Sequence, residues 1–427
     1  MLTQVLVKNF KSFRDARIPL GRLTIVLGSN GAGKSNLFDA IRFLRFVGMG
    51  TSIRDAIEGH ASATQLELVV SGIRGGARAI THMGSDSKVF TVGVEIHDER
   101  TKDRISYVLS VDAISYKVVS EELVSQKHPG QYVFSTHPDP NPLVQDLDAP
   151  VIQARFYKNT RGPNPKRDFS AYETILSQFK GGRSESILNE EVADLVRNEL
   201  AAIRPLELRP EVLRQYSPLG RSELGEHGEN LAAVAWLLET RATSSDEDMR
   251  GDAPARLEAI RSWLSELAPH PIERITVQLS PTSDAILALK EEPFPEPLSA
   301  RSLSDVTLRF AALTFAVFGT EGRQTLVVEE LENGIHPARL ALLVRMLETA
   351  VSQDVRVQVI ASSHAPGVLQ YASEEVARRC VVIGWDAEEV ASRAVVLGDL
   401  PEFDRTLAEF GLGELQAEGW FQAAADR

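Results

Sequence analysis

The order of apolar and polar positions predicts strands and helices that alternate at both ends of the chain. Residues 2–8 and 22–27 alternate or run apolar, which is typical of strands. From Lys34 to about Phe46 the apolar residues recur at helical spacing, and they are Leu37, Phe38, Ile41 and Leu44. Later in the chain the same order recurs, with a helix expected at 302–319, a buried strand at 324–328, a helix at 337–352 and a buried strand at 355–361. We expect the two chain ends to share one sheet.

The middle of the chain has a different pattern. Residues 89–96 and 105–111 are rich in strand-forming residues, and the polar stretch between them suits a hairpin. Residues 116–123 continue this pattern, residues 127–150 predict an irregular loop, and a helical section follows over roughly 170–265. The expected fold class is α/β, with an antiparallel β section and an inserted helical lobe. We divide the chain into three segments, which are 1–170, 171–300 and 301–427.

Composition limits the classes of protein that fit this pattern. The 427 residues carry a formal net charge of −13, which argues against a protein that coats nucleic acid with its whole surface. A local basic groove stays open, because phosphate binding depends on where the charges lie. No apolar run reaches the roughly 18 residues of a membrane span, and the amino terminus has no secretory signal pattern. With Cys380 as its single cysteine, the chain is expected to be cytoplasmic, with no membrane partner.

Residues Gly28–Ser35 form a glycine-rich loop between a predicted strand and a predicted helix. Gly28, Gly33, Lys34 and Ser35 match the phosphate-binding motif in the context that this motif requires, which argues against a chance glycine turn. Glycines allow backbone N–H groups to wrap phosphates, and the start of a helix favours negative charge. We expect Lys34 to contact the β- and γ-phosphates of ATP and the Ser35 hydroxyl to bind Mg²⁺.

Two carboxylates follow the strand predicted at 324–328. Glu329 and Glu330 stand at its carboxyl end, where open α/β sheets bind ligands. One carboxylate can hold Mg²⁺, directly or through water, and the next can polarise the attacking water. The alternative is an acidic loop after a core strand, and the glycine loop elsewhere in the chain favours the functional interpretation.

A histidine, His364, ends the buried strand that follows the carboxylates, after two serines. A single histidine is usually structural or simply exposed. Its place after this strand favours a sensor of the γ-phosphate or of the attacking water.

The three blocks together resemble the ABC-type ATPases of the RecF/OLD-like (overcoming lysogenisation) group, which are relatives of the SMC proteins. Three further segments also resemble this group, and they are Val7–Phe13, residues 224–232 and Leu303–Phe310. The resemblance covers both chain ends firmly and the middle loosely. It implies a P-loop NTPase fold of the ABC/SMC-head type, ATP and Mg²⁺ as ligands, and a homodimer that sandwiches ATP.

The resemblance assigns roles to individual residues. The Walker A loop would consist of Ser29, Asn30, Gly31, Ala32, Gly33, Lys34, Ser35 and Asn36. Glu329 would be the Walker B acid that binds the metal with Ser35, and Glu330 would be the catalytic glutamate. His364 would be the switch histidine, and Asn333–Pro337 would form the D-loop. Gln178 would be the Q-loop glutamine, close to the nucleotide and the metal.

Residues Ser304–Thr307 would form the signature motif, in which Ser304 and Thr307 contact ATP held by the opposite subunit. A monomer would therefore have only half of each active site. The group usually has glycine where this chain has Val306, and a β-branched residue adds bulk at that point. We hypothesise a looser ATP sandwich or slower turnover, which an unchanged ATPase rate in Val306→Gly would contradict.

Nuclease activity in this chain is not expected. OLD-type nucleases carry a Toprim domain with a glutamate and an Asp-x-Asp pair, and no Asp-x-Asp follows His364 here. The resemblance implies an ATPase that acts on DNA or controls a separate effector, such as a nuclease subunit, in bacterial defence or DNA maintenance.

The candidate segment for DNA contact is 155–183, where basic residues interleave with aromatic ones. Such a segment suits backbone neutralisation and base stacking, and a solvated loop is the alternative. The residues concerned are Arg155, Phe156, Tyr157, Lys158, Arg161, Lys166, Arg167, Phe169, Lys180 and Arg183. Two other functions stay open: a non-hydrolysing scaffold that senses ATP or DNA, which Val306 favours, and a RecF-like loader in DNA repair.

Overall fold

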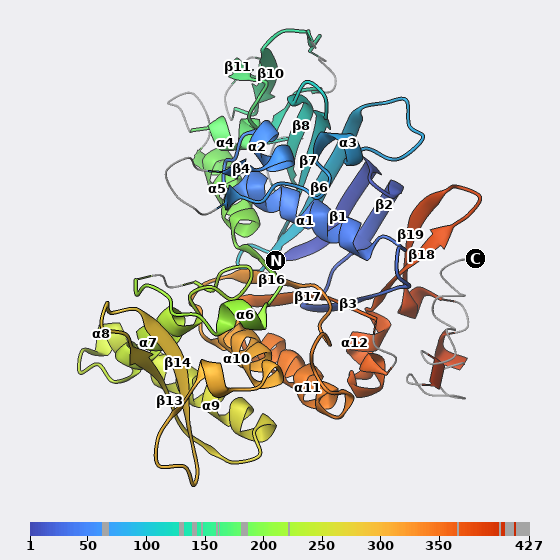
Figure 1. The fold of residues 1–427 in the computed structure, drawn as a ribbon. Helices are drawn as coiled ribbons and strands as arrows, with labels where there is room; N and C mark the ends of the chain where they lie inside the picture. The colour runs from blue at the N-terminus through green and yellow to red at the C-terminus, as the bar shows by residue number, and fades with distance from the viewer. Residues whose placement is uncertain are drawn as a thin grey trace. The chain divides into compact units, whose positions relative to one another are not determined.

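The structure is a computed structural model in which two compact units can be described (Figure 1). Unit 1 contains Met1–Ile203 and the segment that begins at Arg378, and unit 2 contains Arg204–Ala377. The predicted division into three segments stays a prediction, because compactness does not show which segment folds alone. The structure describes the chain except for residues 62–67, 128–131, 139–142, 147, 159–160, 162, 181–186, 221–222, 365–366, 401–402, 406–413 and 416–427.

An eight-stranded antiparallel sheet dominates unit 1. Its strands are β1 (Leu2–Phe10), β2 (Phe13–Pro19), β6 (Val89–Asp98), β7 (Asp103–Asp112), β8 (Lys117–Ser125), β9 (Phe134–Ser135), β10 (Val151–Phe156) and β11 (Lys166–Ser170), in the order β11–β10–β9–β8–β7–β6–β1–β2. The predicted strands at 89–96, 105–111 and 116–123 are confirmed. Buried and more exposed residues alternate along β7, so one face of the sheet meets the core.

Helix α1 (Lys34–Gly48) lies on a face of this sheet (Figure 1). The ring of Phe43 packs edge-on against Phe90 of β6, with the ring centroids 5.4 Å apart. The apolar spacing that predicted this helix is therefore the spacing of its buried face. Unit 1 also contains the long helix α5 (Ile187–Ala201) and the short elements α2 (Ile53–Glu58), β4 (His60–Ala61), β5 (Leu68–Val70), α3 (Gly76–Ala79) and α4 (Ile175–Gln178).

A second group of strands in unit 1 joins early and late parts of the chain. Strand β3 (Leu23–Leu27) pairs in parallel with β18 (Val381–Asp386), which pairs antiparallel with β19 (Ala391–Val396). This pairing confirms that early and late parts of the chain share one sheet, but the strand predicted at 2–8 lies in the eight-stranded sheet instead, as β1. The sequence pattern did not predict β18 or β19.

Unit 2 contains a parallel pair of strands with a helical crossover. Strand β16 (Gln324–Val328) is followed by α11 (Pro337–Gln353) and then by β17 (Val357–Ser363), and the two strands pair from Gln324 and Val357 onward. Every residue of both strands is buried, which explains their continuous apolar character. The strands and the helix predicted here are confirmed.

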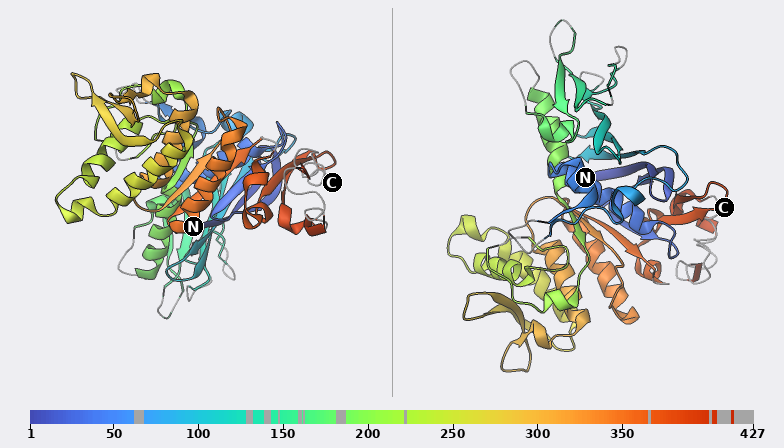
Figure 2. Two further views of the ribbon diagram at one scale, coloured as in Figure 1. Left: turned by 90° about the horizontal axis from the view of Figure 1, so that it is seen from below. Right: turned by 45° about the horizontal axis from the view of Figure 1, so that its top comes forward.

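The section predicted to be helical contains helices and also strands. The helices are α6 (Pro210–Leu213), α7 (Leu231–Ala242), α8 (Glu247–Arg250) and α9 (Ala253–Leu267), and helix α10 (Asp305–Phe318) packs against several of them. Two further features were not predicted from the sequence: strand β12 (Ile203–Leu206), and a three-stranded antiparallel sheet of β13 (Ile272–Leu279), β14 (Ala285–Glu291) and β15 (Leu298–Ser299). Strand β13 is mostly exposed, so its apolar alternation is weak. Figure 2 shows α7 and α9 beside this sheet.

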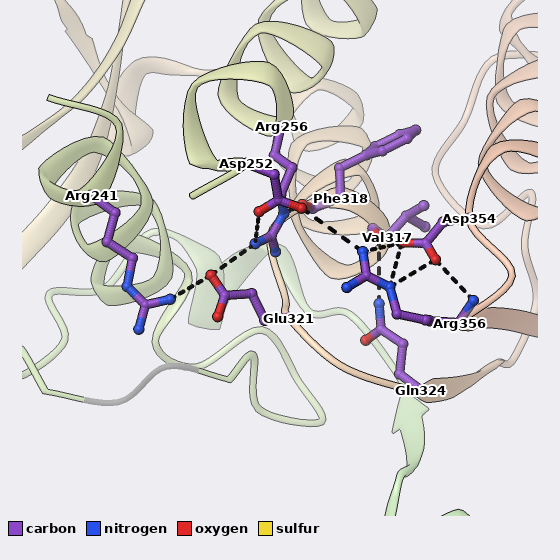
Figure 3. Close-up of polar contacts among 9 residues, drawn as sticks. All are labelled: Arg241, Asp252, Arg256, Val317, Phe318, Glu321, Gln324, Asp354 and Arg356. Carbon is purple, nitrogen blue, oxygen red and sulfur yellow. Dashed lines mark hydrogen bonds and ion pairs between the residues drawn. The ribbon is translucent and has the colours of Figure 1, made fainter. Parts of the chain in front are cut away.

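A network of charged residues surrounds the end of α10 in unit 2 (Figure 3). The Nε of Arg256 donates to the carbonyl of Phe318, the last residue of α10, at 2.7 Å. A cation here suits the negative end of the helix dipole. Arg256 also forms an ion pair with Glu321. Glu321 forms a second ion pair with Arg241, whose guanidinium nitrogen lies 2.6 Å from the Glu321 carboxylate. These contacts attach α7 and α9 to the end of α10.

The described part of the chain includes no helix that is both long and apolar enough to cross a membrane. Short helical elements complete the fold after α11, namely 3-10 helices at Val368–Tyr371 and Leu397–Asp399 and helix α12 (Glu374–Arg378).

Candidate functional site

The glycine loop of unit 1 is built by close backbone approach. All five residues of β3 are buried, and the chain then turns through Gly28 before α1 begins at Lys34. A Cβ on Gly28 would overlap the Ile383 carbonyl of β18. Gly33 has a φ of +115°, and a Cβ there would overlap the hydroxyl of Ser392. Glycine is therefore required at both positions.

The side chain of Lys34 lies inside the loop. Only 6% of this residue is exposed, and its Nζ donates to the carbonyls of Gly28 at 2.6 Å and Ser29 at 2.9 Å. The ammonium is thus held among the loop carbonyls, while Ser29, Asn30, Gly31 and Ser35 are exposed. The predicted phosphate contact needs a cation at this place.

Two serines that the sequence analysis did not single out support the loop from outside. The Ser392 hydroxyl of β19 donates to the Ala32 carbonyl at 2.5 Å, and its backbone N–H donates to the Ser12 carbonyl at 2.7 Å. The Asn36 side chain donates to the Ser12 hydroxyl at 2.7 Å. No sequence signal identifies Ser392, because it stands 360 residues from its partner Ala32.

A charged cluster is formed by Asp39 of α1 and two basic residues from other segments. Asp39 is 1% exposed and forms ion pairs with Lys11 and with Arg74, whose Nε lies 3.0 Å from it. Arg74 also donates to the carbonyl of Ser35 at 2.7 Å. A buried aspartate on the apolar face of a predicted helix was a signal for this cluster, which the sequence analysis missed.

The carboxylates predicted in unit 2 follow β16. Glu329 is partly exposed, and the Glu330 side chain is 52% exposed. Glu330 has a φ of +52°, a left-handed backbone that a non-glycine residue adopts at a cost. Its N–H donates to the Ser362 hydroxyl of β17 at 2.9 Å. A strained residue held in this way is typical of functional sites.

Glu330 and His364, which follow the parallel strands β16 and β17, lie close to each other. The Nε2 of His364 is 3.7 Å from Oε1 of Glu330, and the His364 side chain is 33% exposed. Both groups are thus accessible to solvent, and they are close enough for a single water molecule to contact both.

The residues predicted to form the signature motif begin α10. Ser304 is the N-cap residue, and its hydroxyl accepts from the Thr307 N–H at 3.1 Å and lies 2.8 Å from the Thr307 hydroxyl. Val306 is in the first turn. Arg309 of the same helix donates to the carbonyl of Asn333 at 2.9 Å, which links the signature helix to the predicted D-loop.

Gln178 makes local contacts. Its amide oxygen accepts from the Ser170 N–H at 2.9 Å, and its amide nitrogen donates to the carbonyls of Ser170 and Glu173. In the described residues its side chain bonds only to the backbone of its own segment and the end of β11. Its role as a ligand of nucleotide and metal stays a prediction.

A fully buried carboxylate anchors the helix that carries Gln178. Glu121 of β8 accepts from the N–H groups of Ile175 and Leu176, at 2.6 and 2.8 Å, and from the Tyr107 hydroxyl at 3.0 Å. Burial raises the pKa of Glu121 to about 7, although these three hydrogen bonds lower it. The same burial, with Glu121 nearby, raises the pKa of Tyr107.

The candidate DNA segment is partly structural. Phe156 is fully buried and stacks on Phe179 at 4.7 Å between ring centroids, so its ring is not available to a base. Arg155 donates to the Asn164 carbonyl, and Arg167 lies over the ring of Phe156 at 5.8 Å. Arg183 lies outside the described residues.

The strand–loop–helix unit around Lys34 defines the class of protein, a P-loop NTPase. A solved structure of an SMC head bound to the C-winged helix domain of ScpA has the same fold, with a TM-score of 0.51 and 14% identity. The match covers 92% of this chain and 97% of that one. The predicted fold class, a P-loop NTPase of the ABC/SMC-head type, is thereby confirmed.

The family model described as "AAA domain, putative AbiEii toxin, Type IV TA system" matches residues 23–370, and the chain belongs to this family. Chromosome partition protein Smc of Burkholderia pseudomallei is 25% identical over 67% of this chain, and that of Bordetella petrii is 26% identical over 60%. The alignments span only 24% and 21% of the length of these two relatives. The resemblance to SMC relatives is confirmed at this level.

Proposed function

We propose that the protein binds and hydrolyses ATP as an ABC-type ATPase of the RecF/OLD-like group. The observation that carries this proposal is the glycine loop with the Lys34 ammonium held inside it. Gly33 caps α1 without a side chain, and the first turn of α1 has no acidic residue, so nothing there repels an anion. Lys34 would contact the β- and γ-phosphates.

Glu330 and His364 would carry the hydrolytic step. Glu330 would polarise the water that attacks the γ-phosphorus, and the bond to the ADP oxygen would break as the new P–O bond forms. His364, with its ring next to Glu330, would sense the γ-phosphate. Both side chains are accessible to water, as this role requires.

The residues also suit Mg²⁺. The Ser35 hydroxyl, the Glu329 carboxylate and the Gln178 amide are oxygen ligands, the kind that Mg²⁺ prefers. In the described part of the chain no group of three or more His, Cys, Asp or Glu side chains could hold a metal on its own, so water and phosphate oxygens would complete the coordination. When bound, the metal neutralises charge on the β- and γ-phosphates.

The proposed active assembly is an ATP-dependent homodimer. Ser304 caps α10 and is exposed, and Thr307 lies partly exposed in the first turn, so their hydroxyls would be accessible to ATP held by a second copy. We further propose that the dimer acts on DNA or controls a separate effector, such as a nuclease, in defence or DNA maintenance. An SMC head that binds a partner domain is a precedent for such control.

The test is ATP turnover by wild type, Lys34→Ala and Glu330→Gln, with exposed Lys88→Ala as the control. We expect Lys34→Ala to lose ATP binding and Glu330→Gln to keep binding but to lose about a hundredfold or more in kcat. Size-exclusion chromatography of Glu330→Gln with ATP should show a dimer. Added duplex DNA or a candidate effector then identifies which partner stimulates turnover.

A second candidate is a scaffold that binds ATP or senses DNA without turnover, and Val306 in the signature favours it. Bulk at the start of α10 would keep the opposite γ-phosphate at a distance. ATP binding without turnover in wild type, and turnover in Val306→Gly, would support the scaffold.

A further inference from the structure

The turn that follows β16 is tied to β17 by its backbone. Within the turn, the Asn333 N–H donates to the Glu330 carbonyl at 2.8 Å. The Leu331 N–H donates to the Ser362 carbonyl at 2.9 Å, beside the bond from Glu330 to the Ser362 hydroxyl. These backbone bonds fix the backbone at Glu330, and none of them is made to the peptide of His364.

The side chain of Glu332 supplies that support. Its Oε1 accepts from the backbone N–H of His364 at 2.5 Å, a charge-assisted bond between residues 32 positions apart. The ring of His364 faces Glu330 at 3.7 Å. The same turn therefore holds the catalytic carboxylate directly and the histidine through Glu332.

The other oxygen of Glu332 lowers the stability of the fold. Oε2 is buried, and in the described residues it has no hydrogen-bond partner; Nε of Arg309 is in the same state. An unpaired buried polar atom lowers stability. The Glu332 carboxylate therefore combines one charge-assisted bond to His364 with an oxygen that lowers the stability of the fold.

We propose that Glu332 is a positioning residue for ATP hydrolysis, which sets the distance between His364 and Glu330 by holding the His364 peptide. This inference rests on the proposed function. Glu332 itself would contact neither ATP nor the attacking water, and it would act through the backbone of His364. A displacement of about 1 Å in such a group can lower a rate by about a hundredfold.

The experiment compares Glu332→Ala, which removes the bond, with Glu332→Gln, which keeps an acceptor of the same length. The matched control is Glu348→Ala, since Glu348 of α11 also accepts a backbone N–H, that of Ser373 at 2.7 Å, away from Glu330 and His364. Each variant is measured for kcat and KM of ATP and for hydrogen exchange of peptides that cover residues 357–364.

We expect Glu332→Ala to lower kcat by about ten- to a hundredfold with KM within about twofold, and to speed exchange at His364. Glu332→Gln should retain most of both properties, and Glu348→Ala should leave kcat unchanged. Unchanged turnover in Glu332→Ala despite faster exchange would overturn the inference, and so would a loss in Glu332→Gln as large as in Glu332→Ala. Wild type without turnover would instead refute the proposed function, and with it this role of Glu332.

Discussion

The glycine loop of unit 1 and the acidic turn of unit 2 are held in different ways. In the loop Lys34 is buried, and the neutral hydroxyls of Ser12 and Ser392 bond to Asn36 and to the Ala32 carbonyl, while the tip at Ser29–Gly31 is exposed. The turn is open to solvent at Glu330 and His364, and a strained backbone and charge-assisted bonds hold it. We infer that binding depends on a rigid, close-packed frame, and that chemistry depends on a few hydrogen bonds that can be changed one at a time.

The largest effect on ATP affinity should come from adding a methyl group to the glycine loop. In Gly33→Ala the new Cβ would overlap Ser392 Oγ and lie 2.6 Å from Ser12 Oγ, with a backbone φ that alanine disfavours. We expect ATP affinity to fall by about a hundredfold or more, measured by titration calorimetry. Gly31→Ala is the control, because its φ is also positive but no atom lies within 4 Å of the new Cβ. An equal loss in both variants would show that backbone conformation, not packing, controls the loop.

A buried carboxylate in unit 1 allows a comparison with the exposed ones of unit 2. The pKa of Glu121 is about 7 in the folded chain against 4.5 as the reference value, so the folded state binds the proton more tightly. Its contribution to the free energy of unfolding is greatest below pH 4.5 and is lost as pH rises to about 7. As pH rises from 4.5 to about 7, the free energy of unfolding of Glu121→Gln should therefore increase by about 3 kcal/mol relative to that of wild type.

Urea unfolding of wild type and Glu121→Gln at pH 4.5 and pH 8 measures this difference. Both proteins are unfolded at the same temperature in each buffer. The difference between their free energies of unfolding then cancels the contributions of all other titrating groups, because these groups are common to the two proteins. A stability difference that stays constant with pH would contradict the raised pKa of Glu121.

Two serine variants should separate binding from chemistry, with the smallest effects of the three tests. Ser392→Ala removes the bond to the Ala32 carbonyl and should weaken ATP binding by about tenfold at constant kcat. Ser362→Ala removes the bond to the Glu330 N–H and should lower kcat by about tenfold at constant affinity. Both serines are almost fully buried, so each controls for the other. Equal changes in both constants would show that the two regions are not independent.

The sequence predicted features whose signals are local. The glycine loop, the strands near residues 89–123 and the two buried parallel strands each have a complete pattern within a short window. Glu330 and His364 were predicted because each follows a buried strand, and the structure brings them to 3.7 Å from each other, but their catalytic roles stay predictions.

Other features depend on distant partners and could not be predicted. Ser392 supports Ala32 across 360 positions, and Glu121 binds the N–H groups of residues 54 and 55 positions away. The exposed strand β13 has too few buried residues to show an alternation. The role of Glu332 was missed because its bond is to a backbone atom, and a backbone N–H has no sequence signature.

The parallel pairing of β3 with β18 has a consequence for how the chain folds during synthesis. Val26 pairs with Val381, so β3 leaves the ribosome long before its neighbour does. Until then the loop lacks the Ile383 carbonyl and the Ser392 hydroxyl that surround Gly28 and Gly33. Since contacts of large sequence separation form slowly, the nascent chain should acquire nucleotide affinity only after β19 has been made.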